Sequence, residues 1–137
     1  MVSTRTMKSM IRLTCMASLL FVLLGSCQKE DSTKIVHGNI TLKVLVKHHD
    51  WTIHYLNVYL KSNTAVWPGR DSTLYDSMTQ TTQDGRCEFS GLYPGDYYLY
   101  ASGFDPVVFT NVIGYMPVQI ASGLTNNTGE VTLYVSE

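Results

Sequence analysis

The sequence predicts an all-β protein, a seven-stranded antiparallel β-sandwich with Greek-key connections. Three observations lead to this fold class. Apolar residues alternate with polar ones at a period of two along several segments. Turn sequences separate these segments, namely WPGRD at 67–71, QDGR at 83–86, YPGD at 93–96 and TNNTG at 125–129. No amphipathic helical stretch interrupts them, and short strands at such spacing are typical of two packed antiparallel sheets.

The first strand is predicted over residues 39–47, NITLKVLVK, where Ile40, Leu42, Val44 and Val46 share one face. The segment LNVYLK at 56–61 repeats this scheme, with Leu56, Val58 and Leu60 pointing inward. Further strands are expected at 73–80, 86–90, 96–102, 115–121 and 130–136. The chain therefore has enough alternating segments for two sheets.

The N-terminal stretch has the pattern of a secretory signal. Arg5, Lys8 and Arg12 precede an almost wholly apolar run at 13–25, and charged residues follow Cys27 at once. A helix that spans a bilayer needs about 20 apolar residues, and this run is shorter. We therefore expect a signal peptide at 1–26 and no stable transmembrane helix there.

The sequence LGSC at 24–27 resembles the lipobox of bacterial lipoproteins. The resemblance implies that Cys27 becomes the first mature residue and carries acyl chains, which would hold the protein stably on a membrane. The following QKEDST looks like a surface-export signal of lipoproteins in one Gram-negative phylum, although its composition also suits an ordinary polar linker. We expect a tether at 27–36, a β-sandwich domain at 37–137, and an outer-membrane, cell-surface location.

Charge and cysteine content narrow the possible partners. Loss of the signal would leave seven basic and eleven acidic residues, a formal charge of about −4, so nucleic acid is not expected to bind. Cys15 would leave with the signal and Cys27 would be acylated, so Cys87 has no intramolecular partner. Cys87 and Phe89 share parity on one strand, which predicts a buried, unreactive thiol.

The segment GLYPGDYYLYA at 91–101 has the pattern of a tyrosine corner. Pro94 would preset φ, and Gly95 would allow the positive φ of a type II turn. Tyr97 should then point inward and bond its hydroxyl to backbone a few residues upstream. This pattern assigns Tyr97 a structural role.

The longer stretch TTQDGRCEFSGLYPGDYYLYA at 81–101 resembles prealbumin-like, carboxypeptidase regulatory-like and collagen-binding B-type modules. Cys87 departs from that pattern, which usually has a larger apolar residue there. The resemblance implies a prealbumin-like β-sandwich of Ig-like architecture. It leaves the function open, because such modules serve as adhesins, spacers, transporter appendages and pilus parts.

The sequence offers no recognisable catalytic, cofactor or metal site. The four histidines, His37, His48, His49 and His54, lack the spacings of metal ligands, and neighbours on a strand should point to opposite faces. No nucleophile elbow or glycine-rich phosphate loop is present. We therefore expect a protein that is not an enzyme and that binds no cofactor or metal.

Tyrosine supplies the candidate binding face. Tyr98 and Tyr100 alternate with inward residues, as do Tyr55 and Tyr59 on a strand expected to be their neighbour. These four tyrosines would form one exposed face able to dock a protein or stack on glycan rings. The favoured alternative is that they are sheet scaffolding, because tyrosine suits half-exposed strands.

Two further expectations concern modification and function. The triplets Asp31-Ser32-Thr33, Asp71-Ser72-Thr73 and Asp76-Ser77-Met78 look like acceptors for bacterial O-glycosylation, although Asp and Ser are also common in turns. The sequence favours an outer-membrane or cell-surface lipoprotein that acts as a non-catalytic binding or accessory module for an unknown protein or glycan. The alternatives are a structural subunit of fimbriae or of an envelope assembly and, third, an enzyme of unrecognised type.

Overall fold

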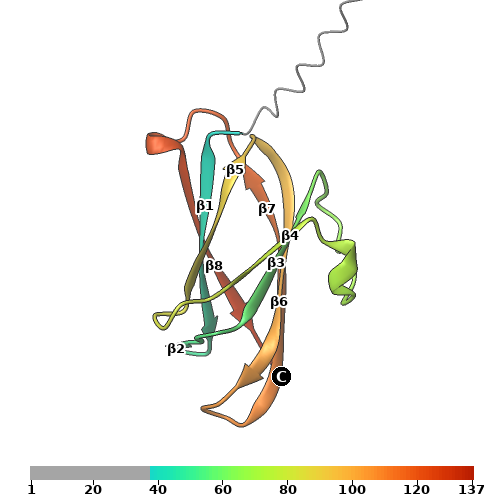
Figure 1. The fold of residues 1–137 in the computed structure, drawn as a ribbon, viewed down its shortest axis with the longest axis vertical. Coiled ribbons are helices and arrows are strands. Elements are labelled where there is room, and N and C mark those ends of the chain that lie inside the picture. Colours follow the sequence, from blue (N-terminus) through green and yellow to red (C-terminus); the bar gives the residue numbers. More distant parts are fainter. Residues whose placement is uncertain (1–37) are drawn as a thin grey trace, which may run out of the picture. The chain divides into compact units, whose positions relative to one another are not determined.

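Two four-stranded sheets make up the part of the chain that the computed structural model describes, residues 38–137 (Figure 1). One sheet contains β1 (Ile40–His48), β2 (Trp51–Thr52), β5 (Arg86–Leu92) and β8 (Thr128–Val135). The other has the order β4 (Ser77–Gln80), β3 (Asn57–Ser62), β6 (Gly95–Asp105) and β7 (Thr110–Ile120). The predicted all-β sandwich is confirmed.

Several predictions fall on residues that lie outside this described part. These are the signal peptide at 1–26, the lipidated Cys27, the tether at 27–36 and the Asp31-Ser32-Thr33 triplet. Within residues 38–137, no helix is long and apolar enough to cross a bilayer. The helical elements described there are two short 3-10 turns, η1 (Ser72–Leu74) and η2 (Thr125–Asn127).

β1 is the central strand of its sheet, and it has both antiparallel and parallel neighbours. β8 pairs with it in parallel along residues Thr41–His48, while β5 and the short β2 pair antiparallel with it. The parallel pair and the eighth, two-residue strand differ from the seven-stranded antiparallel arrangement that the pattern suggested. Alternation cannot reveal strand direction, because side chains alternate in the same way in both directions.

The core lies between the two sheets and follows the predicted alternation. In β1 the residues with even numbers are buried, and on β5 the buried pair is Cys87 and Phe89, as predicted. Burying one such aliphatic or aromatic side chain contributes about 1.5–3 kcal/mol. The described core consists of Ile40, Leu42, Val44, Val46, Ile53, Leu56, Val58, Leu60, Cys87, Phe89, Tyr97, Leu99, Ala101, Val112, Val118, Ile120, Leu133 and Val135.

The tyrosine corner is confirmed. Tyr97 is 6% exposed, and its hydroxyl donates to the Tyr93 carbonyl at 2.9 Å and accepts from the Tyr93 N–H at 3.1 Å. Gly95 has a φ of +153°, a conformation that L side chains rarely adopt, so its predicted positive φ is confirmed. The predicted type II turn is wrong, because that turn has a φ of about +80° at this position. The turn therefore fixes where the chain crosses from β5 in one sheet to β6 in the other.

Two features of the second sheet differ from the sequence prediction. β6 and β7 form one long hairpin, in register from Gly95↔Ile120 to Asp105↔Thr110, that projects beyond the other strands (Figure 1). The expected strand at 73–80 begins only at Ser77, because residues 63–76 leave the sheet and include η1. The Asp71 side chain caps η1 by accepting the Thr73 N–H at 2.9 Å, which stabilises a turn there in place of a strand.

Candidate functional site

The predicted tyrosine face lies on β3 and β6, which are neighbours as expected. Tyr59 stands opposite Tyr100 in the register, and their rings stack with centroids 5.8 Å apart and an interplanar angle of 25°. Both side chains lie on the side of the sheet that faces away from the core, because the alternating residues Val58 and Leu99 are in the core. The predicted cross-strand arrangement of these two residues is correct.

The prediction that this face is open is wrong. Tyr98 is 7% exposed and Tyr100 is 4% exposed. Tyr75, from the segment 63–76, packs against the face, with its ring 5.5 Å from that of Tyr100 and 5.8 Å from that of Tyr59. Tyr55 is 62% exposed but precedes β3, in a loop with φ +59°. The four tyrosines therefore do not form a continuous exposed surface.

Segment 63–76 turns this side of the sheet into a second, smaller packed layer. The Tyr75 hydroxyl donates to the Gly69 carbonyl at 2.8 Å, which holds the segment in its folded-back path. Burial raises the pKa of the Tyr75 and Tyr98 phenols, since the charged phenolate is poorly solvated there. Alternation along a strand shows the side to which a residue points, but it cannot show that a distant segment covers that side.

A stacked aromatic pair forms the rim of this layer. Trp67 and Tyr115 lie face to face, with ring centroids 4.4 Å apart and an interplanar angle of 9°. They are 36% and 48% exposed, so the rim remains accessible while the tyrosines on β6 are covered. Sequence reasoning did not identify this pair, because the two residues are far apart in the chain.

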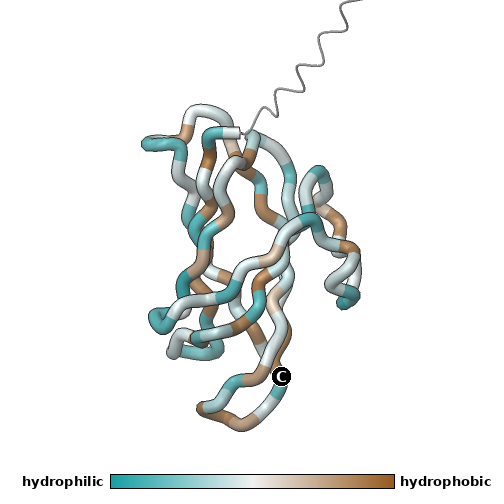
Figure 2. The backbone as a smooth tube through the Cα atoms, viewed as in Figure 1, coloured by the Kyte–Doolittle hydropathy of each residue, from teal (hydrophilic) through white to brown (hydrophobic). Residues whose placement is uncertain are grey.

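The β6–β7 hairpin carries a different exposed surface at its end. Phe104, Val107, Val108 and Phe109 are 51%, 60%, 41% and 81% exposed. We refer to these four residues as the apolar tip, and Figure 2 shows a hydrophobic stretch at this end of the hairpin. Phe109 has a φ of +54°, which is rare for a bulky residue. The sequence FDPVVF at 104–109 carries the signal, since apolar residues surround what is otherwise a turn.

A buried polar cluster lies beside this hairpin, where β1 ends. His48 is 1% exposed and Asp105 is 0% exposed. The His48 Nδ1 atom lies 2.7 Å from Asp105 Oδ2, which also accepts the Trp51 indole N–H at 3.1 Å. The other oxygen of Asp105 accepts the Val107 N–H at 2.8 Å. The carboxylate thus joins β1 to the first residues of the hairpin loop.

The electrostatics of Asp105 follow from these bonds. Burial opposes its ionisation, but the hydrogen bonds from His48, the Val107 amide and Trp51 together hold its pKa below the usual value. Asp105 is therefore an ionised acceptor within the domain, and its neighbour Nδ1 acts as the donor.

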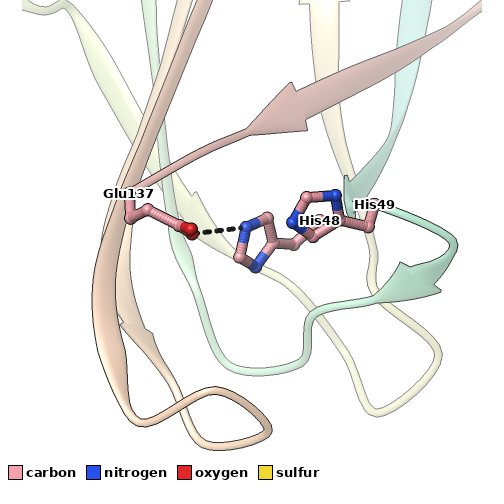
Figure 3. Close-up of side chains that lie close together, drawn as sticks. All are labelled: His48, His49 and Glu137. Atoms are coloured by element: carbon pink, nitrogen blue, oxygen red, sulfur yellow. Dashed lines mark ion pairs between the residues drawn. The ribbon is translucent and has the colours of Figure 1, made fainter.

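The other nitrogen of His48, Nε2, lies 3.0 Å from Glu137 Oε2, and the ring of His49 lies beside the His48 ring (Figure 3). We expected His48 and His49 to point to opposite faces, and this expectation is wrong. β1 ends at His48, and His49 has a left-handed φ of +52°, so its ring folds back to stack on His48 with centroids 4.4 Å apart. The alternation rule does not apply beyond the last residue of a strand.

A groove separates the exposed edges of β4 and β5. It has a volume of about 420 Å³. Its lining residues are Lys43, Thr79, Gln80, Thr82, Arg86, Cys87, Glu88 and Glu130. Burial raises the pKa of the Cys87 thiol to about 12, so the thiol in this groove stays protonated at neutral pH and is a poor nucleophile.

The two glycosylation triplets within the described residues lie close together on segment 63–76 and β4. Ser72, Thr73 and Ser77 are exposed, and all three line one surface hollow of about 300 Å³. The Thr73 hydroxyl donates to Asp71 at 2.8 Å. Accessibility at these hydroxyls is compatible with modification, which stays a prediction.

Comparison with known proteins adds a likeness in structure. No family model matches the chain, and no curated protein matches it. Among solved structures, a variant of BcpA, the major pilin subunit of Bacillus cereus, is similar with a TM-score of 0.49 and 13% sequence identity. The likeness covers 73% of this chain and 30% of the pilin, so the chain spans about a third of that protein's length.

Proposed function

We propose that this chain is a non-catalytic binding module, held at the outer membrane and cell surface by a lipidated Cys27, that contacts a protein partner through its apolar tip. The observation that carries this proposal is the exposure of four neighbouring apolar side chains, between 41% and 81%, on one projecting hairpin. Monomeric soluble proteins rarely expose large contiguous apolar patches unless these make contacts.

The position of the tip supports this role. The described domain begins at Gly38, whose N–H donates to the Gly91 carbonyl at one end of the sandwich. The nine residues of β1 then run toward the tip, a distance of about 30 Å at 3.3 Å per residue. The apolar tip therefore lies at the end of the described domain opposite to Gly38.

The chemistry of the tip favours a protein over a glycan. Its exposed side chains are hydrocarbon, and both oxygens of the adjacent Asp105 already accept hydrogen bonds within the domain. A glycan site would need free polar groups beside its aromatic rings. An apolar protein surface needs none, and buried aromatic anchors dominate such contacts.

The side chains around His48 support a non-catalytic role. Within residues 38–137, its two ring nitrogens face the carboxylates of Asp105 and Glu137, and no serine or cysteine hydroxyl or thiol is bonded to either. The high pKa of Cys87 argues against covalent catalysis by that thiol.

The test compares two double variants on whole cells after mild crosslinking. Val107→Ser with Phe109→Ser should abolish the crosslinked partner band, while stability should change by less than about 0.5 kcal/mol, since both side chains are exposed. The control, Val66→Ser with Leu74→Ser, removes similarly exposed apolar groups from segment 63–76. Equal partner recovery from both double variants would contradict the proposal.

The groove between β4 and β5 favours a second candidate, a structural subunit that associates through sheet edges. Among the described strands, β4 pairs with β3 alone and β5 with β1 alone, so each leaves one edge open. An extended segment of a partner could add to such an edge. Self-association that persists in the Val107→Ser, Phe109→Ser variant, measured by light scattering, would favour this candidate.

A further inference from the structure

The starting point is the Nε2 atom of His48. This atom is shielded from solvent and has no hydrogen-bond partner within the described residues, although it lies 3.0 Å from Glu137 Oε2. Nδ1 lies 2.7 Å from Asp105 Oδ2, and when Nδ1 donates to that oxygen, the lone pair of Nε2 points at a second carboxylate, that of Glu137. Two acceptors at this distance repel each other unless a cation lies between or beside them.

The other side of the ring has the arrangement of an oriented metal ligand. Histidines that bind a metal through one nitrogen usually donate the other N–H to a carboxylate, which fixes the tautomer and the ring orientation. Asp105 takes this position, and it is itself held by the Trp51 and Val107 N–H groups. Nε2 is thereby left with a free lone pair in a fixed direction.

His49 and Glu137 supply two further donor atoms. One ligand atom from each of His48, His49 and Glu137 lies within 4.8 Å of the other two (Figure 3). A tetrahedral zinc ion with bonds of about 2.0–2.1 Å needs ligand atoms about 3.3 Å apart. The His48–Glu137 separation of 3.0 Å is close to this value. His49 and Glu137 are exposed and can adjust by side-chain rotation.

The backbone at His49 supports the same interpretation. Its left-handed φ of +52° is uncommon for a residue other than glycine, and it is this turn that brings the second imidazole onto the first. Unusual backbone conformations persist where the surroundings demand them, often at binding sites.

We propose that His48, His49 and Glu137 bind a divalent transition-metal ion of the zinc type, with Asp105 as a positioning residue. Two imidazoles and one carboxylate suit zinc and its neighbours in the first transition row, whereas calcium and magnesium prefer oxygen ligands alone. The ion would link the end of β1 to Glu137, which follows β8. This inference does not rest on the protein contact proposed for the apolar tip.

The experiment titrates Zn²⁺ into the full chain in detergent by calorimetry, after EDTA treatment and alkylation of accessible thiols so that cysteine cannot hold the ion. The wild type should bind one ion per chain. His49→Ala and Glu137→Gln should each weaken the affinity at least about tenfold, and Asp105→Asn by about 10- to 100-fold. Control variants His54→Ala and Glu130→Gln should retain the wild-type affinity.

Thermal unfolding gives the second measurement. Zn²⁺ should raise the Tm of the wild type and of both controls, and at the same Zn²⁺ concentration it should raise the Tm of His49→Ala and Glu137→Gln by less. The two substituted ligands are exposed, so these variants should fold as the wild type does in EDTA. Wild-type affinity in both ligand variants, or no Zn²⁺ binding by the wild type, would overturn the proposal.

Discussion

At the residue scale, Cys87 shows how burial sets reactivity. The side chain is 8% exposed in the core, and desolvation raises its thiol pKa from 9.0 to about 12. Cys87 therefore behaves as a small buried hydrophobe. The same burial protects the thiol from reagents that need the thiolate.

This pKa leads to a prediction for the chain with Cys15 and Cys27 replaced by Ser, in which Cys87 is the remaining thiol. Native Cys87 should react with a disulfide reagent at pH 8 far more slowly than in the urea-unfolded chain. The pKa of Cys87 is higher in the folded chain than in the unfolded chain, so burial of the protonated thiol stabilises the fold. This stabilisation is complete below about pH 9 and is lost as the pH rises toward 12. Between pH 9 and 12, the unfolding free energy of the chain that keeps Cys87 should decrease with pH more steeply than that of Cys87→Ala. The difference in slope should be up to about 1.4 kcal/mol per pH unit. Equal thiol reactivity in the native and unfolded chains would contradict the assignment.

Tyr97 gives a second prediction at this scale. Tyr97→Phe removes a hydroxyl that bonds both backbone groups of Tyr93, so the unfolding free energy should fall by about 1–3 kcal/mol. Tyr134→Phe is the matched control, since Tyr134 is 63% exposed on β8. Urea denaturation would measure the unfolding free energies of the two variants. Equal midpoints would argue against a stabilising role for the tyrosine corner.

At the element scale, segment 63–76 decides what the second sheet presents to solvent. It places Tyr75 over Tyr100 and Tyr59, and it leaves the Trp67–Tyr115 pair half exposed. Its closing contact is Asp76, whose carboxylate accepts from the Lys61 ammonium and the Ser62 N–H, each at 2.7 Å. The segment thus behaves as part of the fold, although it contains no regular strand.

Removing the ring of Tyr75 should test this role. Tyr75→Ala should lower the unfolding free energy by about 2 kcal/mol, since stacked aromatic pairs add about 0.5–1.5 kcal/mol to the area buried. Leu74→Ala, at a neighbouring side chain that is 44% exposed, should cost much less. Chemical denaturation compares the two variants. An equal denaturation midpoint for Tyr75→Ala and Leu74→Ala would mean that the packing of Tyr75 against the sheet does not stabilise the fold.

At the scale of the whole molecule, the proposed lipidation of Cys27 leads to a prediction about membrane attachment. Cys27→Ser should move the protein from the membrane fraction to the soluble fraction, because acylation needs that sulfur. Cell fractionation followed by immunoblotting measures this. Continued extraction by detergent alone would reject lipidation at Cys27, whereas Lys29→Ala with Asp31→Ala should keep the membrane attachment as the control.

The sequence by itself was sufficient for the sandwich, the inward face of each early strand and the tyrosine corner. These features depend on local alternation and on turn residues such as Gly95, whose backbone preferences act within a few residues. Alternation also predicted correctly that Tyr59 and Tyr100 lie on the side away from the core.

Only the tertiary structure decided which of the outward-facing side chains are covered and which of the distant side chains meet. Tyr100 is covered by Tyr75, which lies more than twenty residues away in sequence, and no period-two pattern can report such coverage. The cluster of His48, His49 and Glu137 needs a left-handed residue at a strand end and the parallel pairing of β1 with β8. Both are long-range outcomes of packing, because side chains distant in the chain meet only when the sheets close on a common core.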